Sequence, residues 1–152
     1  LLDRLKKKGS LEKLKGHVRF SSLQYLKIKP VQRTFGANEE TLTITLNNYV
    51  LLSPEAINLD EANRFKLQTI INSEPLALIE YWAVDPDYDG KLFRSIWQDY
   101  RGNTDNDGDP LRVTTKTQLT VPAKADSRKI CVRAVDVFGF EAEVTAIVAA
   151  TK

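Results

Sequence analysis

The stretch KICVRAVDVFGFEAEV, residues 129–144, decides the fold of this chain. Its residues alternate between two sides of an extended backbone, with Ile130, Val132 and Ala134 on one side and Cys131, Arg133 and Val135 on the other. The alternation breaks at residues 136–139, which include a glycine, and resumes over residues 141–148. Period-two alternation on both sides of a glycine-containing turn indicates a hairpin in a half-buried antiparallel sheet.

The same period recurs nearer the N-terminus. Residues 41–51 (TLTITLNNYVL) place Leu42, Ile44 and Leu46 on one side, and residues 17–31 also have an extended pattern. The turn-forming residues 36–40 lie between them, so we expect an antiparallel pair at the start of the sheet. Five more strands are expected, at residues 76–85, 93–101, 111–121, 129–137 and 142–149.

One helix is expected between these strands. Asn58–Glu61 offers an N-cap, and residues 62–71 carry Phe65, Leu67 and Ile70, which we expect to form one buried face. A second helical segment is expected at residues 1–15, where leucines at positions 2, 5, 11 and 14 are interrupted by a Gly-Ser pair.

Short strands at this spacing favour two packed sheets over an alternating α/β arrangement. The expected fold class is therefore mainly β: an immunoglobulin-like or PKD-like antiparallel β-sandwich with one inserted helix and an N-terminal helical linker. Residues 1–15 would form the linker from an upstream domain, and residues 16–152 the sandwich. A chain of 152 residues can bury about 70% of its unfolded surface as one domain.

The amino-acid composition indicates the cellular compartment of the protein and the reactivity of its cysteine. Cys131 is the only cysteine, so it cannot form an intramolecular disulfide, and its β-branched neighbours predict a buried, inert thiol. This cysteine usage favours a reducing compartment, and we expect a cytoplasmic protein without a membrane contact. No apolar run approaches the roughly 20 residues of a membrane-spanning helix. The chain starts at Leu1 and lacks methionine, which leads us to expect a longer parent protein.

The net charge of +2 hides an uneven distribution along the chain. Residues 1–35 hold ten Lys/Arg and two Asp/Glu, residues 36–110 hold five and fourteen, and residues 111–152 hold seven and four. The basic N-terminal segment would suit contact with phosphates. It would equally suit the solvated surface of a short helix.

Catalytic motifs are missing from the sequence. His17 is the only histidine, so a Ser-His-Asp triad or a multi-histidine metal site cannot form elsewhere, and no glycine-rich phosphate loop is present. We therefore expect no enzyme activity, no metal and no cofactor in this chain by itself.

Two Asp-rich turns resemble the start of a calcium loop. In residues 85–90 the acids alternate before a glycine, but Ile96 occupies the position that requires a bidentate glutamate. In residues 105–109 the sixth position is taken by Pro110. Asp and Asn also favour such turns for purely conformational reasons. Calcium binding here is a hypothesis.

The aromatic residues of the middle of the chain have two interpretations. Trp82 and Trp97, on adjacent expected strands, would form a core pair, or they could stack on bases as in nucleic-acid platforms. We expect the core pair. Tyr100, Arg94 and Arg101 would then remain as surface contacts.

Three stretches, in this order, carry a resemblance to a known family. They are IEYWAVDPDYDG (residues 79–90), Phe93 with WQDYR (residues 97–101), and ICVRAVDVFG (residues 130–139). Together they resemble the C-terminal region of adenine-specific DNA methyltransferases and type III-like modification subunits, which closes with a PKD-like or immunoglobulin-like β module. The resemblance covers residues 17–148 in outline. Pro86 departs from the pattern, which has an aromatic residue there, and the catalytic motifs of the family are missing.

The resemblance implies a non-catalytic C-terminal accessory domain of a restriction-modification-type methyltransferase. S-adenosylmethionine would belong to the catalytic part of the parent protein. The accessory domain would contact DNA backbone, the rest of the methyltransferase chain or a partner subunit. Candidate phosphate contacts, none of which would select a base sequence, are Lys6, Lys7, Lys8, Lys13, Lys15, Arg94, Arg101 and Arg112.

An alternative from another class is a structural or adhesion-type PKD-like module, in which an exposed sheet edge mediates protein–protein association. A third possibility, calcium-dependent carbohydrate binding through the Asp-rich loops and the aromatic residues, would require a complete metal site.

Overall fold

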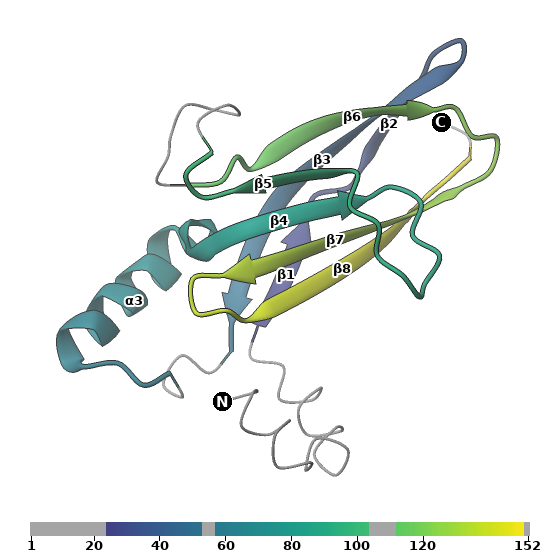
Figure 1. Ribbon diagram of the computed structural model, residues 1–152. Helices are drawn as coiled ribbons and strands as arrows, with labels where there is room; N and C mark the ends of the chain where they lie inside the picture. The colour runs from purple at the N-terminus through teal and green to yellow at the C-terminus, as the bar shows by residue number, and fades with distance from the viewer. Residues whose placement is uncertain (1–23, 53–56, 104–111, 151–152) are drawn as a thin grey trace.

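The computed structural model describes residues 24–52, 57–103 and 112–150. Over these residues the chain forms two antiparallel sheets that pack face to face, with one α-helix at one end (Figure 1). The predicted β-sandwich with one inserted helix is therefore confirmed. The predicted helical linker at residues 1–15 lies outside the described residues.

The first sheet is built around one long strand, β3 (Glu39–Leu51). On one side of β3, its C-terminal half pairs with β1 (Gln24–Ile28) and its N-terminal half with β2 (Gln32–Phe35). On the other side it pairs with β6 (Lys116–Pro122). The antiparallel pair that we expected at the start of the sheet is confirmed.

The second sheet has the strand order β5-β4-β7-β8, and all three pairings are antiparallel. Its strands are β5 (Trp97–Tyr100), β4 (Ile79–Asp85), β7 (Arg128–Asp136) and β8 (Glu141–Val148). The hairpin predicted from residues 129–148 is formed by β7 and β8. One layer of the sandwich therefore contains β1, β2, β3 and β6, and the other contains β4, β5, β7 and β8.

The core lies between the sheets and follows the predicted alternation. The even-numbered residues of β7 and of β3 up to Leu46 point inward, and those that are buried and apolar are Leu42, Ile44, Leu46, Ile130, Val132 and Ala134. After a register shift the parity of β3 changes, and Tyr49 and Leu51 are the buried residues. Trp82 of β4 is fully buried and meets Trp97 of β5 edge to face, with ring centroids 4.6 Å apart. The predicted tryptophan core pair is confirmed, although Trp97 is only half-buried at the margin of the sandwich.

Helix α3 (Glu61–Ser73) begins where Asp60 accepts a hydrogen bond from the backbone N–H of Asn63 at 2.8 Å. Leu67 is buried and Ile70 partly buried, as predicted, but Phe65 is 75% exposed. The expectation of one shared face was wrong for Phe65, because residues two apart on an α-helix project about 200° apart. The helix is followed by a short 3-10 helix, η2 (Pro75–Leu78), so the predicted strand at 76–85 begins only at Ile79.

The predicted strand at 93–101 is also shorter, because residues 86–96 form a loop. Carboxylates take the backbone N–H groups that a strand would have paired: Asp85 accepts from Arg94 at 2.8 Å, and Asp89 accepts from Lys91 at 2.8 Å and from Leu92 at 2.9 Å. Figure 1 shows this loop folded in front of β7 and β8.

The loop contacts the residues on either side of Cys131 on the outer face of β7. The backbone N–H of Tyr88 donates to the carbonyl of Lys129 at 2.9 Å, and the guanidinium of Arg133 lies 4.6 Å from the ring centroid of Phe93. Cys131 is fully buried and unpaired, as predicted. Burial raises the pKa of its thiol to about 11.

Neither helix in the described part of the chain has the length and apolar character needed to cross a membrane.

Candidate binding groove between two sheet edges

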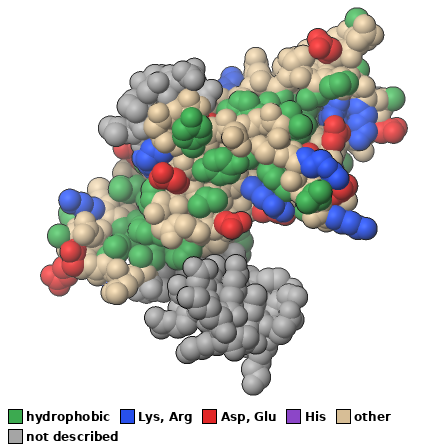
Figure 2. Space-filling model, viewed as in Figure 1, with side chains coloured by type: hydrophobic (Ala, Val, Ile, Leu, Met, Phe, Trp, Pro, Cys, Tyr) green, Lys and Arg blue, Asp and Glu red, His purple; other side chains and the backbone are tan. Residues whose placement is uncertain are grey.

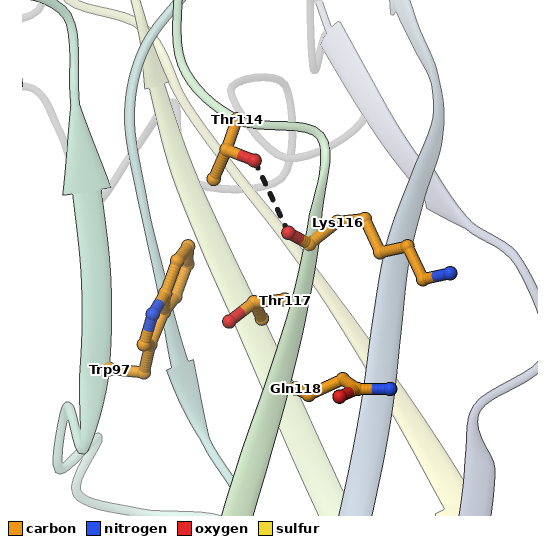
Figure 3. Close-up of a pocket in the computed structure, with 5 residues that line it drawn as sticks. All are labelled: Trp97, Thr114, Lys116, Thr117 and Gln118. Atoms are coloured by element: carbon orange, nitrogen blue, oxygen red, sulfur yellow. Dashed lines mark hydrogen bonds between the residues drawn. The ribbon is translucent and has the colours of Figure 1, made fainter. Parts of the chain in front are cut away.

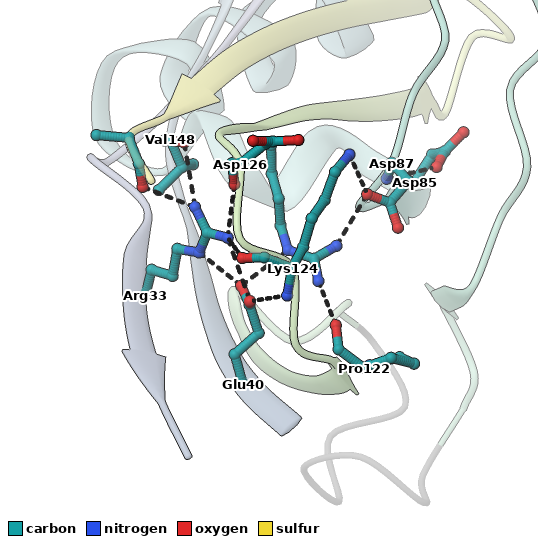
Figure 4. Close-up of polar contacts among 10 residues, drawn as sticks. Arg33, Glu40, Asp85, Asp87, Pro122, Lys124, Asp126 and Val148 are labelled. Atoms are coloured by element: carbon teal, nitrogen blue, oxygen red, sulfur yellow. Dashed lines mark hydrogen bonds and ion pairs between the residues drawn. The ribbon is translucent and has the colours of Figure 1, made fainter. Parts of the chain in front are cut away.

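A buried ionic cluster holds one end of the sandwich together (Figure 4). Glu40 of β3 accepts hydrogen bonds from Arg33 of β2 at 2.6 Å and from Arg128 of β7 at 2.8 Å, and all three side chains are at most 3% exposed. The backbone N–H of Lys124, in the turn between β6 and β7, donates to the same carboxylate at 2.8 Å. The cluster thereby joins β2 and β3 of the first sheet to β7 of the second, beside the C-terminal end of β6.

Besides Glu40, both arginines of this cluster donate hydrogen bonds to other acceptors. Arg33 donates to the carbonyls of Lys124, Asp126 and Ala149 at 2.7–2.9 Å. Arg128 donates to Asp87 at 2.9 Å and to the carbonyl of Pro122. Burial alone would raise the pKa of Glu40, but the hydrogen bonds from both arginines and from Lys124 lower it to about 2. The cluster is therefore a buried ionic network that joins the two sheets, and each of its charged groups has hydrogen-bond partners.

The N-terminal end of β6 is held through Thr114. Its backbone N–H donates to the buried carboxylate of Asp99 at 2.6 Å, and its carbonyl accepts from the indole N–H of Trp82 at 2.8 Å. Asp99 lies on β5 and Trp82 on β4, so both contacts join the start of β6 to the opposite sheet. The edges of β5 and β6 are thus fixed at a set separation.

Between these two edges lies a groove of about 480 Å³, lined by Trp97, Thr114, Lys116, Thr117 and Gln118 (Figure 3). Figure 3 shows the side chain of Thr117 pointing toward the indole of Trp97, while the side chains of Lys116 and Gln118 point to the other side of β6. The groove therefore has one aromatic wall, from β5, and a wall made of a sheet edge.

The register of β6 determines which of its backbone groups face this groove. The N–H of Leu46 donates to the carbonyl of Thr115, and the N–H of Ala123 donates to the carbonyl of Asn38. In an antiparallel ladder the hydrogen-bonded residues alternate, so the odd-numbered residues of β6 bond to β3. The N–H and C=O groups of Lys116, Gln118 and Thr120 therefore point away from β3, and no strand of the described residues pairs with them. The carbonyl of Lys116 accepts a hydrogen bond from the hydroxyl of Thr114 at 3.2 Å (Figure 3).

The other long edge, that of β8, is different. The bond from the N–H of Asp136 to the carbonyl of Phe140 shows that the odd-numbered residues of β8 point away from β7. Gln24 of β1 donates to the carbonyl of Glu141, and Arg33 donates to that of Ala149. Side chains of the first sheet therefore occupy both ends of this edge, whereas the β6 edge opens beside a groove.

The sequence-predicted phosphate contacts lie elsewhere. Lys6, Lys7, Lys8, Lys13 and Lys15 are outside the described residues. The three arginines are each paired with a carboxylate: Arg94 with Asp89 at 3.1 Å, Arg101 with Glu80 at 3.0 Å, and Arg112 with Glu74 at 2.8 Å. Phosphate contact by these arginines stays a prediction.

The described residues show no surplus of positive charge. They carry fourteen Lys/Arg and fourteen Asp/Glu. On the face seen in Figure 2, side chains of both signs are interspersed with apolar ones. Exposed pairs of this kind are weak, so a phosphate could displace a carboxylate from them, but the described surface supplies no uniform positive field.

The first Asp-rich turn uses its carboxylates within the protein. Both oxygens of Asp85 accept backbone N–H groups, Asp87 accepts from Arg128, and Asp89 accepts from Lys91, Leu92 and Arg94. In the described part of the chain, no three His, Cys, Asp or Glu side chains gather to hold a metal ion. Residues 105–109 of the second turn lie outside it.

The sequence did not single out residues 116–122 as a sheet edge, although two signals were present. Residues 116–121 (KTQLTV) alternate between exposed and buried, which is typical of a strand with one solvated face. Pro122 ends the strand, and proline is tolerated in sheets mainly on edge strands. What the sequence could not show is that Trp97 lies across from this edge.

No family model matches this chain, and neither does any curated protein or solved structure with which it was compared.

Proposed function

We propose that this chain is a non-catalytic protein-interaction module that binds an extended segment of a partner protein along the free edge of β6. The observation that supports the proposal is the outward-facing row of backbone groups at Lys116, Gln118 and Thr120, next to the groove walled by Trp97. A peptide that adds a strand to a sheet edge gains main-chain hydrogen bonds, and pockets for alternate side chains supply its selectivity.

The geometry provides both parts of this mode of binding. The backbone groups of β6 face the incoming strand, and the groove can receive a side chain against the indole of Trp97. Since each intermolecular hydrogen bond adds only about 0.5 to 1.5 kcal/mol net, a short peptide should bind weakly and the affinity should depend on several consecutive contacts.

The edge is tested with a labelled peptide of alternating threonine and valine residues, a neutral strand-forming probe. We expect fluorescence anisotropy to show saturable binding to the unmodified protein and its loss in Gln118→Pro. That substitution removes an outward-facing N–H while leaving the ladder to β3 intact, so the fold should persist. Amide hydrogen exchange should slow at Gln118 and Thr120 when the peptide is bound.

The matched control is Thr145→Pro, which removes an outward-facing N–H from the other edge, that of β8. This variant should keep the affinity of the unmodified protein. Thermal unfolding of both proline variants shows whether each is folded. Equal loss of binding in the two folded variants, or binding that survives Gln118→Pro, would contradict the assignment to β6.

A second candidate is the accessory DNA-contact role within a methyltransferase of the restriction-modification type. It is favoured by one observation: residues 1–23 carry seven Lys/Arg and two Asp/Glu, whereas the described residues are neutral. In this role methylation and S-adenosylmethionine would belong to another part of a longer chain. The contact itself would depend on the basic segment, because the candidate arginines of the sandwich already have carboxylate partners.

This role predicts salt-dependent binding of a short DNA duplex, measured by fluorescence anisotropy. Changing Lys6, Lys7 and Lys8 to alanine should reduce the slope of log K against log salt by about one unit for each lysine that contacts a phosphate. The matched variant with Arg94, Arg101 and Arg112 changed to alanine should lower the slope much less. Absence of binding at low salt would dismiss the role for this chain.

A further inference from the structure

We propose that the partner segment carries an acidic residue opposite Lys116 and apolar residues at the positions that face the groove. For an antiparallel partner the order is apolar, any residue, apolar, acid. This inference rests on the proposed function and names the chemistry that the β6 edge selects.

The order of residues follows from the side-chain directions along β6. Thr117 and Leu119 point into the sandwich, and Lys116, Gln118 and Thr120 point outward. Residues directly opposite each other in a sheet point to the same face. Partner residues opposite Thr117 and Leu119 therefore face the groove, where apolar side chains would cover the indole of Trp97. The residue opposite Lys116 lies beside its ammonium group.

Charge indicates the residue that stands opposite Lys116. The side chain of Lys116 lies on the outer face of β6, and it makes no ion pair with a described carboxylate. The same is true of most described lysines, since only Lys124 among them pairs with a carboxylate, but Lys116 is the one that lies on the β6 edge. A glutamate or aspartate on the partner would give Lys116 an ionic partner at cross-strand distance, where opposite charges are favourable and like charges unfavourable.

A second copy of the chain fits this edge less well. Two β6 strands paired with each other would offer only the residues of KTQLTVP, which contain no acid, so no register gives Lys116 an anionic partner. Pro122 also lacks the N–H that would extend such a pairing. The occupant with complementary charge is therefore a segment of a different protein.

The test uses three labelled peptides with the core Val-Thr-Val-X, where X is Glu, Gln or Lys. With the unmodified protein we expect the Glu peptide to bind about two- to fivefold more tightly than the Gln peptide, and the Lys peptide more weakly than both. In Lys116→Glu the order should reverse, with the Lys peptide binding most tightly. The matched control, Lys27→Glu, makes the same charge change on β1 and should keep the original order.

The outcomes separate the inference from the proposed function. If all three peptides bind equally and Gln118→Pro abolishes binding, strand addition at β6 stands and the acidic preference is overturned. A reversal that also occurs in Lys27→Glu would assign the effect to net charge and overturn the role of Lys116. If no peptide binds the folded protein, strand addition fails together with the inference, and Lys116 and Pro122 instead protect the edge from pairing. Sedimentation of the unmodified protein as a dimer through β6 would favour the second copy and overturn the inference.

Discussion

Replacing Glu40 by glutamine is expected to lower the free energy of unfolding by about 3 to 5 kcal/mol. The carboxylate lies between two guanidinium groups that are at most 3% exposed, at 2.6 Å from Arg33 and 2.8 Å from Arg128. A neutral amide of the same shape leaves Arg33 without its carboxylate partner and leaves Arg128 with Asp87 alone. Chemical denaturation of the variant and the unmodified protein measures the difference.

The pH dependence of stability tests the role of Glu40 independently. The pKa of Glu40 falls from an ordinary 4.5 to about 2 in the folded protein, so its ionisation contributes about 3 kcal/mol to the free energy of unfolding at neutral pH. A lowered carboxyl pKa means that this contribution is complete above pH 4.5 and is lost as the pH falls toward 2. In Glu40→Gln this part of the acid-induced loss should disappear.

The control for Glu40 is Glu143→Gln, which removes the acid of an exposed pair with Arg133, at 2.7 Å with both side chains about 40% exposed. Its effect should stay within about 1 kcal/mol, as for other surface pairs. Equal effects of the two substitutions would mean that the buried ion pairs of Glu40 stabilise the fold no more than an exposed pair does.

Trp82→Ala is the second large effect, with an expected loss of about 3 to 5 kcal/mol in the free energy of unfolding. The side chain is fully buried, packs edge to face on Trp97 and donates to the carbonyl of Thr114 at 2.8 Å. The substitution therefore creates a cavity and also releases the start of β6. Thermal and denaturant unfolding measure the loss, and the fluorescence of the remaining Trp97 should shift to the red as water reaches it.

The control for Trp82 is Ile147→Ala on β8, whose side chain is 74% exposed. It should change stability by about 0.5 kcal/mol or less. If Trp82→Ala loses as little as this control, the tryptophan pair does not anchor the core.

Strands with a regular alternation of apolar and polar residues could be predicted from the sequence, because burial of one side of a strand produces that alternation. Residues 41–51 and 129–148 were predicted within a residue or two for this reason. Other segments departed from their predictions, two of them for clear local reasons. Phe65 shares the apolar character of Leu67 but not its direction on the helix, and residues 86–96 form a loop because Asp85 and Asp89 bind backbone N–H groups.

The buried ionic cluster was missed because its partners are far apart in sequence. Arg128 lies 88 residues from Glu40, and spacing alone does not pair them. A signal was nevertheless present. Glu40 has the same parity as Leu42 and Ile44, and Arg128 has the same parity as Ile130, so both charges occupy inward-facing positions. A charge at such a position requires a buried partner of opposite sign.

The candidate binding edge was only partly accessible from the sequence. The alternative of a module that associates through an exposed sheet edge was considered, but which strand forms that edge depends on the order of strands in the sheet. That order results from contacts between β3 and β6, which are more than seventy residues apart. The groove depends further on Asp99 and Trp82, which hold Thr114 from the opposite sheet.

The loop over β7 makes the single thiol of this chain a chemical reporter of local opening. Cys131 is fully buried and the pKa of its thiol is about 11, so an electrophilic thiol reagent can react only after the segment of residues 86–96 lifts from Lys129 and Arg133. When the reagent reacts faster than the segment closes, the modification rate equals the rate at which that segment detaches. The chain thus reports on the dynamics of its own outer surface without any engineered label.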